Sequence, residues 1–100
     1  MRAREKLPGS ILIQVIGVKR LGEYRLEIEF SDGTVGTRDF AFMVVRSGPM
    51  LEPLRDPGYF ARVFIEEGVL TWPNGYDYDS IALHDEMKGE GLLHRGATAE

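Results

Sequence analysis

One stretch of this chain alternates without a break between apolar and charged side chains, and it constrains the fold more than any other feature. Its apolar members are Tyr24, Leu26, Ile28 and Phe30. Its charged members are Glu23, Arg25, Glu27 and Glu29. A period of two places alternate side chains on opposite faces of a β-strand. The pattern therefore predicts an antiparallel strand with one face in the core and the other in water.

The alternating stretch ends at Asp32-Gly33, a pair typical of a two-residue type I′ turn. The chain is then expected to return as a second strand over residues 34–39. Such a turn places Phe30 opposite Val35 and Glu27 opposite Arg38. The second pair predicts a cross-strand ion pair on the wet face, contributing about 0.2–1 kcal/mol.

Other apolar runs predict further strands. The β-branched run Ile11–Val18 suits a strand covered on much of both faces, followed by a turn at Leu21-Gly22. Val63–Ile65 and Val69–Trp72 predict a second hairpin around residues 66–68.

Short helices are expected between and after these strands. Phe40–Val45 fits either a helix or a strand, and its apolar spacing favours a helical turn. Asp56 precedes Pro57 and can cap a helix that ends near residue 62. A last helix begins after Asp79 or Ser80 and continues to about residue 88.

Together these elements predict one α+β domain over residues 10–88. It consists of a small antiparallel β-sheet of about five strands, from two hairpins plus an N-terminal strand, with two or three short helices. Residues 1–9 are expected to form a flexible arm and residues 89–100 a flexible tail.

The composition excludes several classes of function. The chain has no cysteine, which rules out disulfides, thiolate catalysis and cysteine-ligated zinc. Its net charge of −4 argues against a dominant nucleic-acid-binding face. The basic N-terminus and the apolar run after it are interrupted by Glu5, Gln14 and Gly17, so we expect neither a signal peptide nor a membrane span. A cytoplasmic location is the natural expectation.

The order of motifs resembles a bacterial family, the domain-of-unknown-function family 2442, over roughly residues 15 to 85. The motifs are a tyrosine-containing strand from Tyr24 that ends in Phe30-Ser31-Asp32-Gly33, then Gly48-Pro49, Pro53-Leu54-Arg55-Asp56, Phe60, and Trp72-Pro73-Asn74-Gly75-Tyr76-Asp77. The resemblance implies a small α+β domain around an antiparallel sheet, without an established activity or catalytic residues. Some relatives carry an appended helix-turn-helix domain, and others are suspected of forming a toxin–antitoxin-like pair.

The segment after the second hairpin supplies the candidate site. Tyrosine and tryptophan favour protein interfaces because each joins a large apolar body to one polar group. The candidate interface residues are Trp72, Asn74, Tyr76, Asp77, Tyr78 and Asp79. Trp72 itself is expected in the core, because it ends a strand.

Two other interpretations of the acidic residues remain open. Asp77 and Asp79 are hard oxygen ligands of the kind that Ca²⁺ or Mg²⁺ prefers. We favour a structural role, in which Asp77 binds backbone amides of the turn and Asp79 caps the next helix. His84 and His94 belong to no metal-binding pattern and are expected at the rim or partly buried.

The sequence thus favours a non-catalytic protein-binding or regulatory module, with a protein partner or a second copy and no cofactor or metal. One alternative is a nucleic-acid accessory domain that uses Arg2, Arg4, Lys6 and Lys19-Arg20. Another alternative is a metal-binding or enzymatic domain that uses the acidic turn after Trp72.

Overall fold

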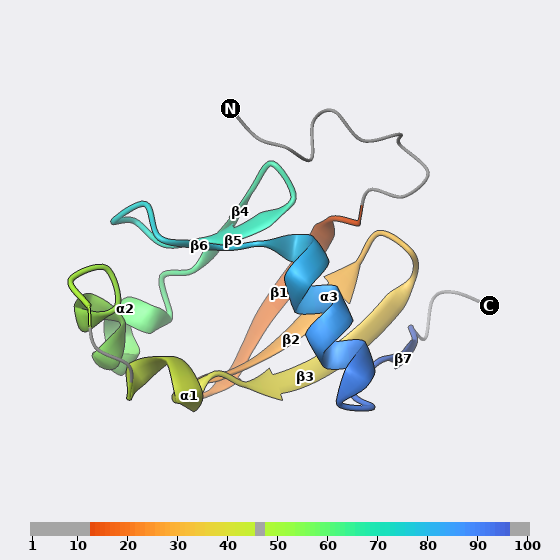
Figure 1. Cartoon of the computed structure of the whole chain (residues 1–100), viewed down its shortest axis with the longest axis horizontal. Helices are drawn as coiled ribbons and strands as arrows, with labels where there is room; N and C mark the ends of the chain where they lie inside the picture. Colours follow the sequence, from red (N-terminus) through yellow and green to blue (C-terminus); the bar gives the residue numbers. More distant parts are fainter. Residues whose placement is uncertain (1–12, 46–47, 97–100) are drawn as a thin grey trace.

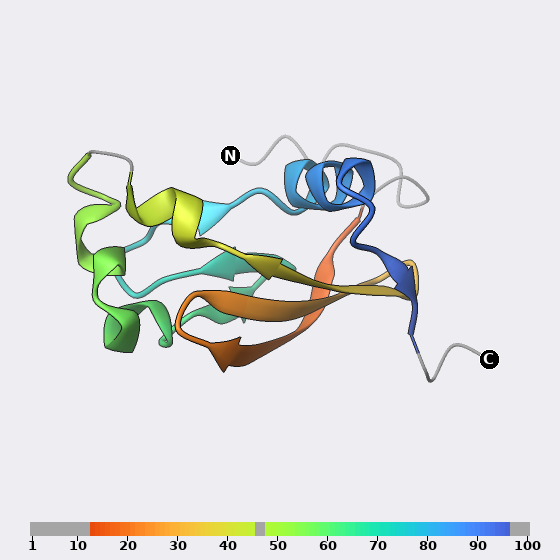
Figure 2. The same ribbon diagram turned by 90° about the horizontal axis from the view of Figure 1, so that it is seen from below.

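The computed structural model describes residues 13–45 and 48–96. Within these ranges the chain forms a four-stranded and a three-stranded antiparallel sheet, with short helices at one end and a longer helix across the other (Figures 1 and 2). The predicted α+β class is confirmed. The strands are more numerous than the five expected, because two of them contain only two residues each and leave no periodic signal in the sequence.

The four-stranded sheet contains the alternating stretch. Its strands, in spatial order, are β1 (Val15–Gly22), β2 (Arg25–Phe30), β3 (Thr34–Asp39) and β7 (His94–Arg95). On β2 the side chains of Leu26, Ile28 and Phe30 are wholly buried. The burial of alternate residues confirms the face assignment.

The predicted pairing of β2 with β3 is wrong by one residue. Glu27 stands opposite Thr37, and Arg38 stands opposite Leu26. The expected ion pair between Glu27 and Arg38 is therefore absent. A slip of one residue moves a side chain to the other face of a strand, so Arg38 lies on the core side of the sheet.

A longer loop causes this slip. Val35 stands opposite Glu29 rather than Phe30, which leaves three residues in the loop. The amide of Gly33 donates to the carbonyl of Phe30 at 3.0 Å, and Gly33 has a φ of 89°. A left-handed residue at the last loop position is typical of three-residue hairpin loops, whereas a type I′ turn has two loop residues.

β1 begins and ends later than expected. The strand was expected over residues 11–18, of which residues 11 and 12 lie outside the described ranges; β1 spans Val15–Gly22. The turn expected at Leu21-Gly22 is instead formed by residues 23 and 24. Ile16 is 54% exposed, so the expected burial of both strand faces is also wrong. An edge strand can continue through the charged pair Lys19-Arg20 because those side chains remain in water.

The second sheet contains the predicted second hairpin. Its strands, in spatial order, are β4 (Phe64–Glu66), β5 (Val69–Thr71) and β6 (Asp77–Tyr78). Glu67 and Gly68 form the turn with φ values of 54° and 79°, as a type I′ turn requires. The hairpin is confirmed.

The helices are short, apart from the last. They are α1 (Ala41–Val44), the 3-10 helix η3 (Glu52–Arg55), α2 (Pro57–Phe60) and α3 (Ser80–Gly89). The ambiguous segment at residues 40–45 is thus helical. Asp56 accepts a hydrogen bond from the amide of Gly58, and Asp79 accepts one from the amide of Ala82, so both predicted caps are confirmed.

Part of the segment expected to form a flexible tail packs against the sheet. The amide of Leu92 donates to the carbonyl of Met87 at 2.9 Å, and β7 then pairs with β3. A Cβ atom on Gly36 would lie 2.5 Å from the carbonyl oxygen of Leu92. The expected arm (residues 1–9) and residues 97–100 lie outside the described ranges. None of the helices in the described ranges is long and apolar enough to span a membrane.

Replacing Gly36 with alanine is expected to destabilise the protein by about 1–3 kcal/mol, because the new Cβ collides with backbone rather than with a movable side chain. Gly89→Ala is the matched control. It meets open space at the end of α3 and should leave stability unchanged or raise it by about 0.5–1 kcal/mol. Urea unfolding measures both; equal stability of the two variants would contradict the close approach.

Candidate functional site

The Trp-Pro-Asn-Gly motif forms a turn that is fixed by hydrogen bonds. Gly75 donates to the Trp72 carbonyl at 2.8 Å, and Trp72 donates to the Tyr76 carbonyl at 2.9 Å. The side-chain oxygen of Asn74 accepts from the Tyr76 amide at 3.1 Å. The side-chain nitrogen of Asn74 donates to the Met50 carbonyl at 3.0 Å. The motif therefore ties the turn to the loop before η3.

Trp72 holds the turn from inside. Its ring is wholly buried, as expected from its place at the end of a strand. Its indole N–H donates to the carbonyl of Phe60 at 2.9 Å, and the two rings pack 5.5 Å apart. Trp72 can therefore position an interface but offers it no side-chain surface.

The remaining candidate residues differ in how much they expose. Tyr76 is half-buried, with its ring 5.9 Å from that of Trp72. Asp77 and Asp79 are exposed, but the carboxylate of Asp79 is engaged in capping α3. The turn amide is bound by Asn74 and not by Asp77 as expected. Asp77 is therefore an exposed carboxylate beside the turn that takes no part in capping α3.

Tyr78 belongs to a polar cluster that the sequence analysis missed. Its hydroxyl donates to Glu86 at 2.5 Å and accepts from Arg38 at 3.3 Å. Arg38 also bonds Glu86 at 2.8 Å and Glu90 at 3.0 Å, and its guanidinium lies 4.7 Å from the ring centre of Phe42. Glu86 and Glu90 are four residues apart on α3, the spacing of one helix face. The spacing of the two glutamates is visible in the sequence. Their partner Arg38 was missed because the predicted register placed it on the wet face of the sheet.

This cluster shifts two ionisations. Burial alone would lower the pKa of Arg38, but the hydrogen bonds that Arg38 donates to Glu86 and Tyr78, together with the charge of Glu90, outweigh burial and raise it. Burial raises the pKa of Tyr78 above its ordinary value of 10.0, and the hydrogen bond to Glu86 raises it further against the opposing effect of Arg38. The cluster thus holds a cation and a neutral phenol between the sheet and α3.

A second polar contact joins the β2–β3 loop to α3. His84 Nε2 lies 2.9 Å from Asp32 Oδ2, and the His84 ring meets Phe30 edge-on at 5.0 Å. Asp32 Oδ1 also accepts from the hydroxyl and the amide of Thr34. Burial alone would raise the pKa of Asp32, but the hydrogen bonds from Thr34 and His84 outweigh it and lower the pKa. His84 is partly buried, as expected.

The contact between His84 and Asp32 borders a hollow of about 240 Å³. The hollow is lined by Asp32, Thr34, His84, Lys88 and Leu93. The carboxylate of Asp32 is bonded both to the imidazole of His84 and to the hydroxyl of Thr34. These groups therefore hold the loop and α3 together, and they are not arranged as a base that faces a substrate. Among the described residues no group of three or more histidine, aspartate and glutamate side chains could hold a metal ion.

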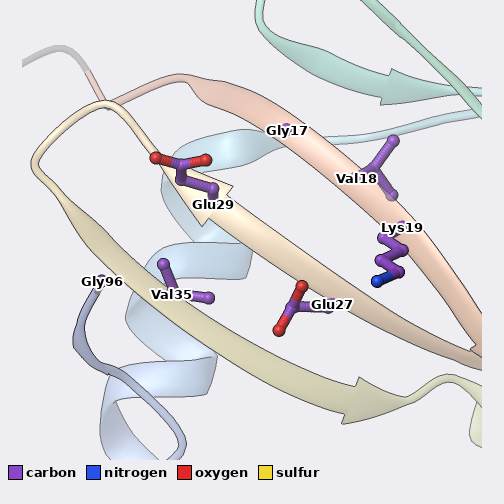
Figure 3. Close-up of a pocket in the computed structure, with 7 residues that line it drawn as sticks. All are labelled: Gly17, Val18, Lys19, Glu27, Glu29, Val35 and Gly96. Carbon is purple, nitrogen blue, oxygen red and sulfur yellow. The ribbon is translucent and has the colours of Figure 1, made fainter. Parts of the chain in front are cut away.

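The four-stranded sheet leaves a shallow, charged hollow of about 410 Å³ on its outer face (Figure 3). The lining residues are Gly17, Val18, Lys19, Glu27, Glu29, Val35 and Gly96. Glu27, Glu29 and Val35 stand in front of the sheet in Figure 3, while α3 lies behind it. Charges of both signs stand there in water, as is ordinary for the wet face of an antiparallel sheet.

Five large apolar side chains are exposed in the described part of the chain. Ile16 and Leu21 on β1 and Phe64 on β4 lie along strands at sheet edges. Val45 and Met50 lie at the helical end of the molecule, which also carries the Trp-Pro-Asn-Gly turn (Figures 1 and 2). Contiguous apolar patches can mark interaction surfaces, whereas apolar side chains that are exposed singly are ordinary.

The fold is that of a small α+β domain with two antiparallel sheets. The chain belongs to the family described as "Protein of unknown function (DUF2442)", whose model matches residues 15–89. This match confirms the resemblance seen in the motifs, and it extends to the last residue of α3. No curated protein and no solved structure matches the chain.

Asp32→Asn should lower the free energy of unfolding near neutral pH by about 0.5–1.5 kcal/mol, since it weakens the bonds to Thr34 and His84. The folded-state pKa of Asp32 lies below the ordinary value of 3.8. The stability it contributes is therefore present above pH 3.8 and is lost as the pH falls through the lower, folded-state pKa. Urea unfolding between pH 2 and pH 7 should show a shallower acid limb in the variant.

Asp85→Asn is the matched control for this prediction, because Asp85 is exposed on the same helix. It should change stability by less than about 0.5 kcal/mol and keep the acid limb of the natural chain. An Asp32→Asn protein with an unchanged acid limb would show that the contact contributes no pH-dependent stability.

Arg38→Lys should destabilise the protein by about 1–3 kcal/mol, because lysine cannot bond Glu86, Glu90 and Tyr78 together. Arg62→Lys is the control. Arg62 is exposed and its guanidinium lies over the ring of Tyr59, an interaction that lysine can also make, so the expected change is below about 0.5 kcal/mol. Thermal unfolding compares the two, and equal losses would mean that the cluster does not fasten α3.

Proposed function

We propose that this protein is a small non-catalytic protein-binding module. It uses a surface formed by Met50, Asn74, Tyr76 and Asp77, here called the turn face. The observation that carries this proposal is the bond from the Asn74 amide to the Met50 carbonyl, which fixes two loops side by side. These loops present an exposed thioether side chain, a half-buried tyrosine and an exposed carboxylate.

Rigidity makes the turn face suited to binding. Binding costs free energy whenever loops and side chains must be ordered. The turn is already held by its own hydrogen bonds and by the buried ring of Trp72, so little ordering remains for a partner to impose. Methionine is polarisable and adapts its shape, which favours contact with varied apolar side chains.

The charge of this surface indicates the chemistry of the partner. Asp77 stands exposed beside Tyr76, and the capping carboxylate of Asp79 follows it in the chain. A partner with a lysine or arginine next to an apolar side chain would match the turn face in both charge and polarity. A second copy of this chain is a weaker candidate, since its net charge is −4.

A regulatory role fits the same surface. The proposed module acts as one member of a pair of small proteins, in the manner of a toxin–antitoxin-like system. The support for this narrower version is the family resemblance, which suggests such pairs for some relatives. A pair of this kind predicts a complex of fixed stoichiometry rather than a transient contact.

The test is a tagged pull-down from the source cells with the natural chain, Asp77→Lys and Met50→Asp as baits. We expect the natural chain to retain a protein of fixed stoichiometry. Each substitution should reduce the retained amount about tenfold or more, because Asp77→Lys reverses the charge of the turn face and Met50→Asp replaces its apolar contact with a carboxylate. Light absorbance of the eluate at nucleic-acid wavelengths distinguishes the accessory-domain alternative.

Asp85→Lys is the matched control, because it makes the same charge change at an exposed position on α3. Unfolding curves establish that each bait is folded. A partner lost equally from all baits, or retained by all of them, would contradict the turn face as the binding surface.

A further inference from the structure

The Trp-Pro-Asn-Gly turn contains the dipeptide Asn74-Gly75, which is chemically labile in an unconstrained chain. Asn74 is the only asparagine of the protein. The backbone nitrogen that follows an asparagine can attack the carbonyl carbon of the asparagine side chain. Glycine in the following position favours this attack, because it has no Cβ atom to hinder the approach and its backbone turns freely. The dipeptide is therefore a candidate for spontaneous modification.

The fold holds both reacting groups of this dipeptide in hydrogen bonds. The attacking nitrogen belongs to Gly75, and its N–H donates to the carbonyl of Trp72 at 2.8 Å. The oxygen of the attacked carboxamide accepts from the Tyr76 amide at 3.1 Å, and its nitrogen donates to the Met50 carbonyl at 3.0 Å. The attack requires the backbone nitrogen to lose its proton and to turn toward the carboxamide carbon, so these bonds must first break. The native turn therefore protects Asn74.

Water reaches this turn from outside. Pro73 and Gly75 are exposed, and Asn74 is only partly buried. Beyond the neighbouring residues of the chain, a Cβ atom added at Gly75 would meet no atom of the described residues within 4 Å. Hydrogen bonds rather than burial therefore protect Asn74, and the opening of these bonds exposes the reacting groups to water.

The bond to Met50 ties the turn to a part of the molecule that can open locally. Met50 precedes η3, and η3 and α2 have only four residues each. Helices of this length are stabilised by packing rather than by their own hydrogen bonds. Such segments open at a lower free energy than the whole domain unfolds. Local opening at the helical end therefore releases the carboxamide nitrogen of Asn74 before the sheets unfold.

We propose that Asn74 is a deamidation site, at which local opening of the helical end lets the asparagine convert to aspartate and isoaspartate. The Gly75 nitrogen gives up its proton to hydroxide and bonds to Cγ of Asn74, and the bond from Cγ to Nδ2 breaks. Nδ2 takes up a proton and leaves as ammonia, and a cyclic succinimide remains. Water then hydrolyses the succinimide at either of its carbonyl groups, which gives aspartate or isoaspartate. The net reaction consumes water and releases ammonia, without an oxidant or a reductant.

Either product removes the tie between the turn and the loop before η3. Aspartate has no side-chain N–H, so at position 74 it sets a carboxylate against the Met50 carbonyl, an acceptor against an acceptor. Isoaspartate also adds a methylene group to the backbone of a turn that is closed by bonds at Trp72. The loss of ammonia is irreversible in water, so the turn keeps a lasting chemical record of opening at the helical end. This chemistry does not depend on partner binding, so the deamidation site and the turn face can fail separately.

The first experiment measures deamidation of the natural chain at mildly alkaline pH by peptide mass spectrometry, in buffer and in denaturing guanidinium chloride. A synthetic peptide of residues 70–79 gives the rate of the unconstrained dipeptide. We expect the peptide and the unfolded chain to convert at similar rates, and the folded chain to convert about tenfold or more slowly, because conversion waits for opening. Equal rates in the folded and the unfolded chain, or an unfolded chain that is not converted at Asn74, would overturn the proposal.

Low concentrations of the same denaturant test whether the opening is local. Local opening exposes little surface, so the conversion rate of the folded chain should rise less steeply with denaturant than the equilibrium constant of global unfolding. Equal slopes would mean that only global unfolding releases Asn74, which contradicts the proposed route.

Two variants test what the product does to the structure. Asn74→Asp should speed hydrogen exchange about fivefold or more at the Leu51 and Glu52 amides of the released loop. Lys88→Gln makes the same change in net charge at an exposed position on α3 and should leave exchange at these amides within about twofold. Equal exchange in the two variants would show that deamidation does not untie the loop. The experiments on the natural chain decide the proposal if Asn74→Asp does not fold.

Discussion

The buried ring of Trp72 is the contact on which the helical end of the molecule depends. Each of α1, η3 and α2 has four residues, far too few for a helix to persist alone in water. The indole packs on Phe60 in α2 and bonds its carbonyl. Tyr24, in the turn between β1 and β2, packs edge-on against the same Phe60, and its hydroxyl donates to the carbonyl of Arg55. Two sheets and three helices thus share one core around Phe60.

The other end of the molecule is held by polar contacts. β3 turns Gly36 and Arg38 toward α3, where a central strand would ordinarily carry large apolar residues. The glycine lets the segment after α3 approach the strand, and the arginine bonds the exposed side of the helix. The contact between Asp32 and His84 fastens the middle of α3 to the β2–β3 loop. The helix is therefore located by hydrogen bonds as well as by burial of Leu83 and Met87.

Local patterns were enough to predict the elements that depend on local chemistry. The alternation before Phe30, the turn at Gly68 and the cap at Asp79 each follow from neighbouring residues. The register of β2 against β3 did not, because an Asp-Gly pair fits loops of two or three residues. The candidate site was predicted as a motif, whereas the contact of Asn74 with Met50 joins residues 24 apart in the chain. Such contacts have no local signature, and the contact between His84 and Asp32 was missed for the same reason.

The burial of Trp72 also gives the protein an internal optical reporter. It is the only tryptophan of the chain, and the emission of an indole moves to longer wavelengths as its surroundings become more polar. Its ring packs against the rings of Phe60 and Tyr76. Loosening of the helical end would therefore change the fluorescence even while the four-stranded sheet stayed intact. A comparison of fluorescence with far-ultraviolet circular dichroism can separate the melting of the two ends without introducing a label.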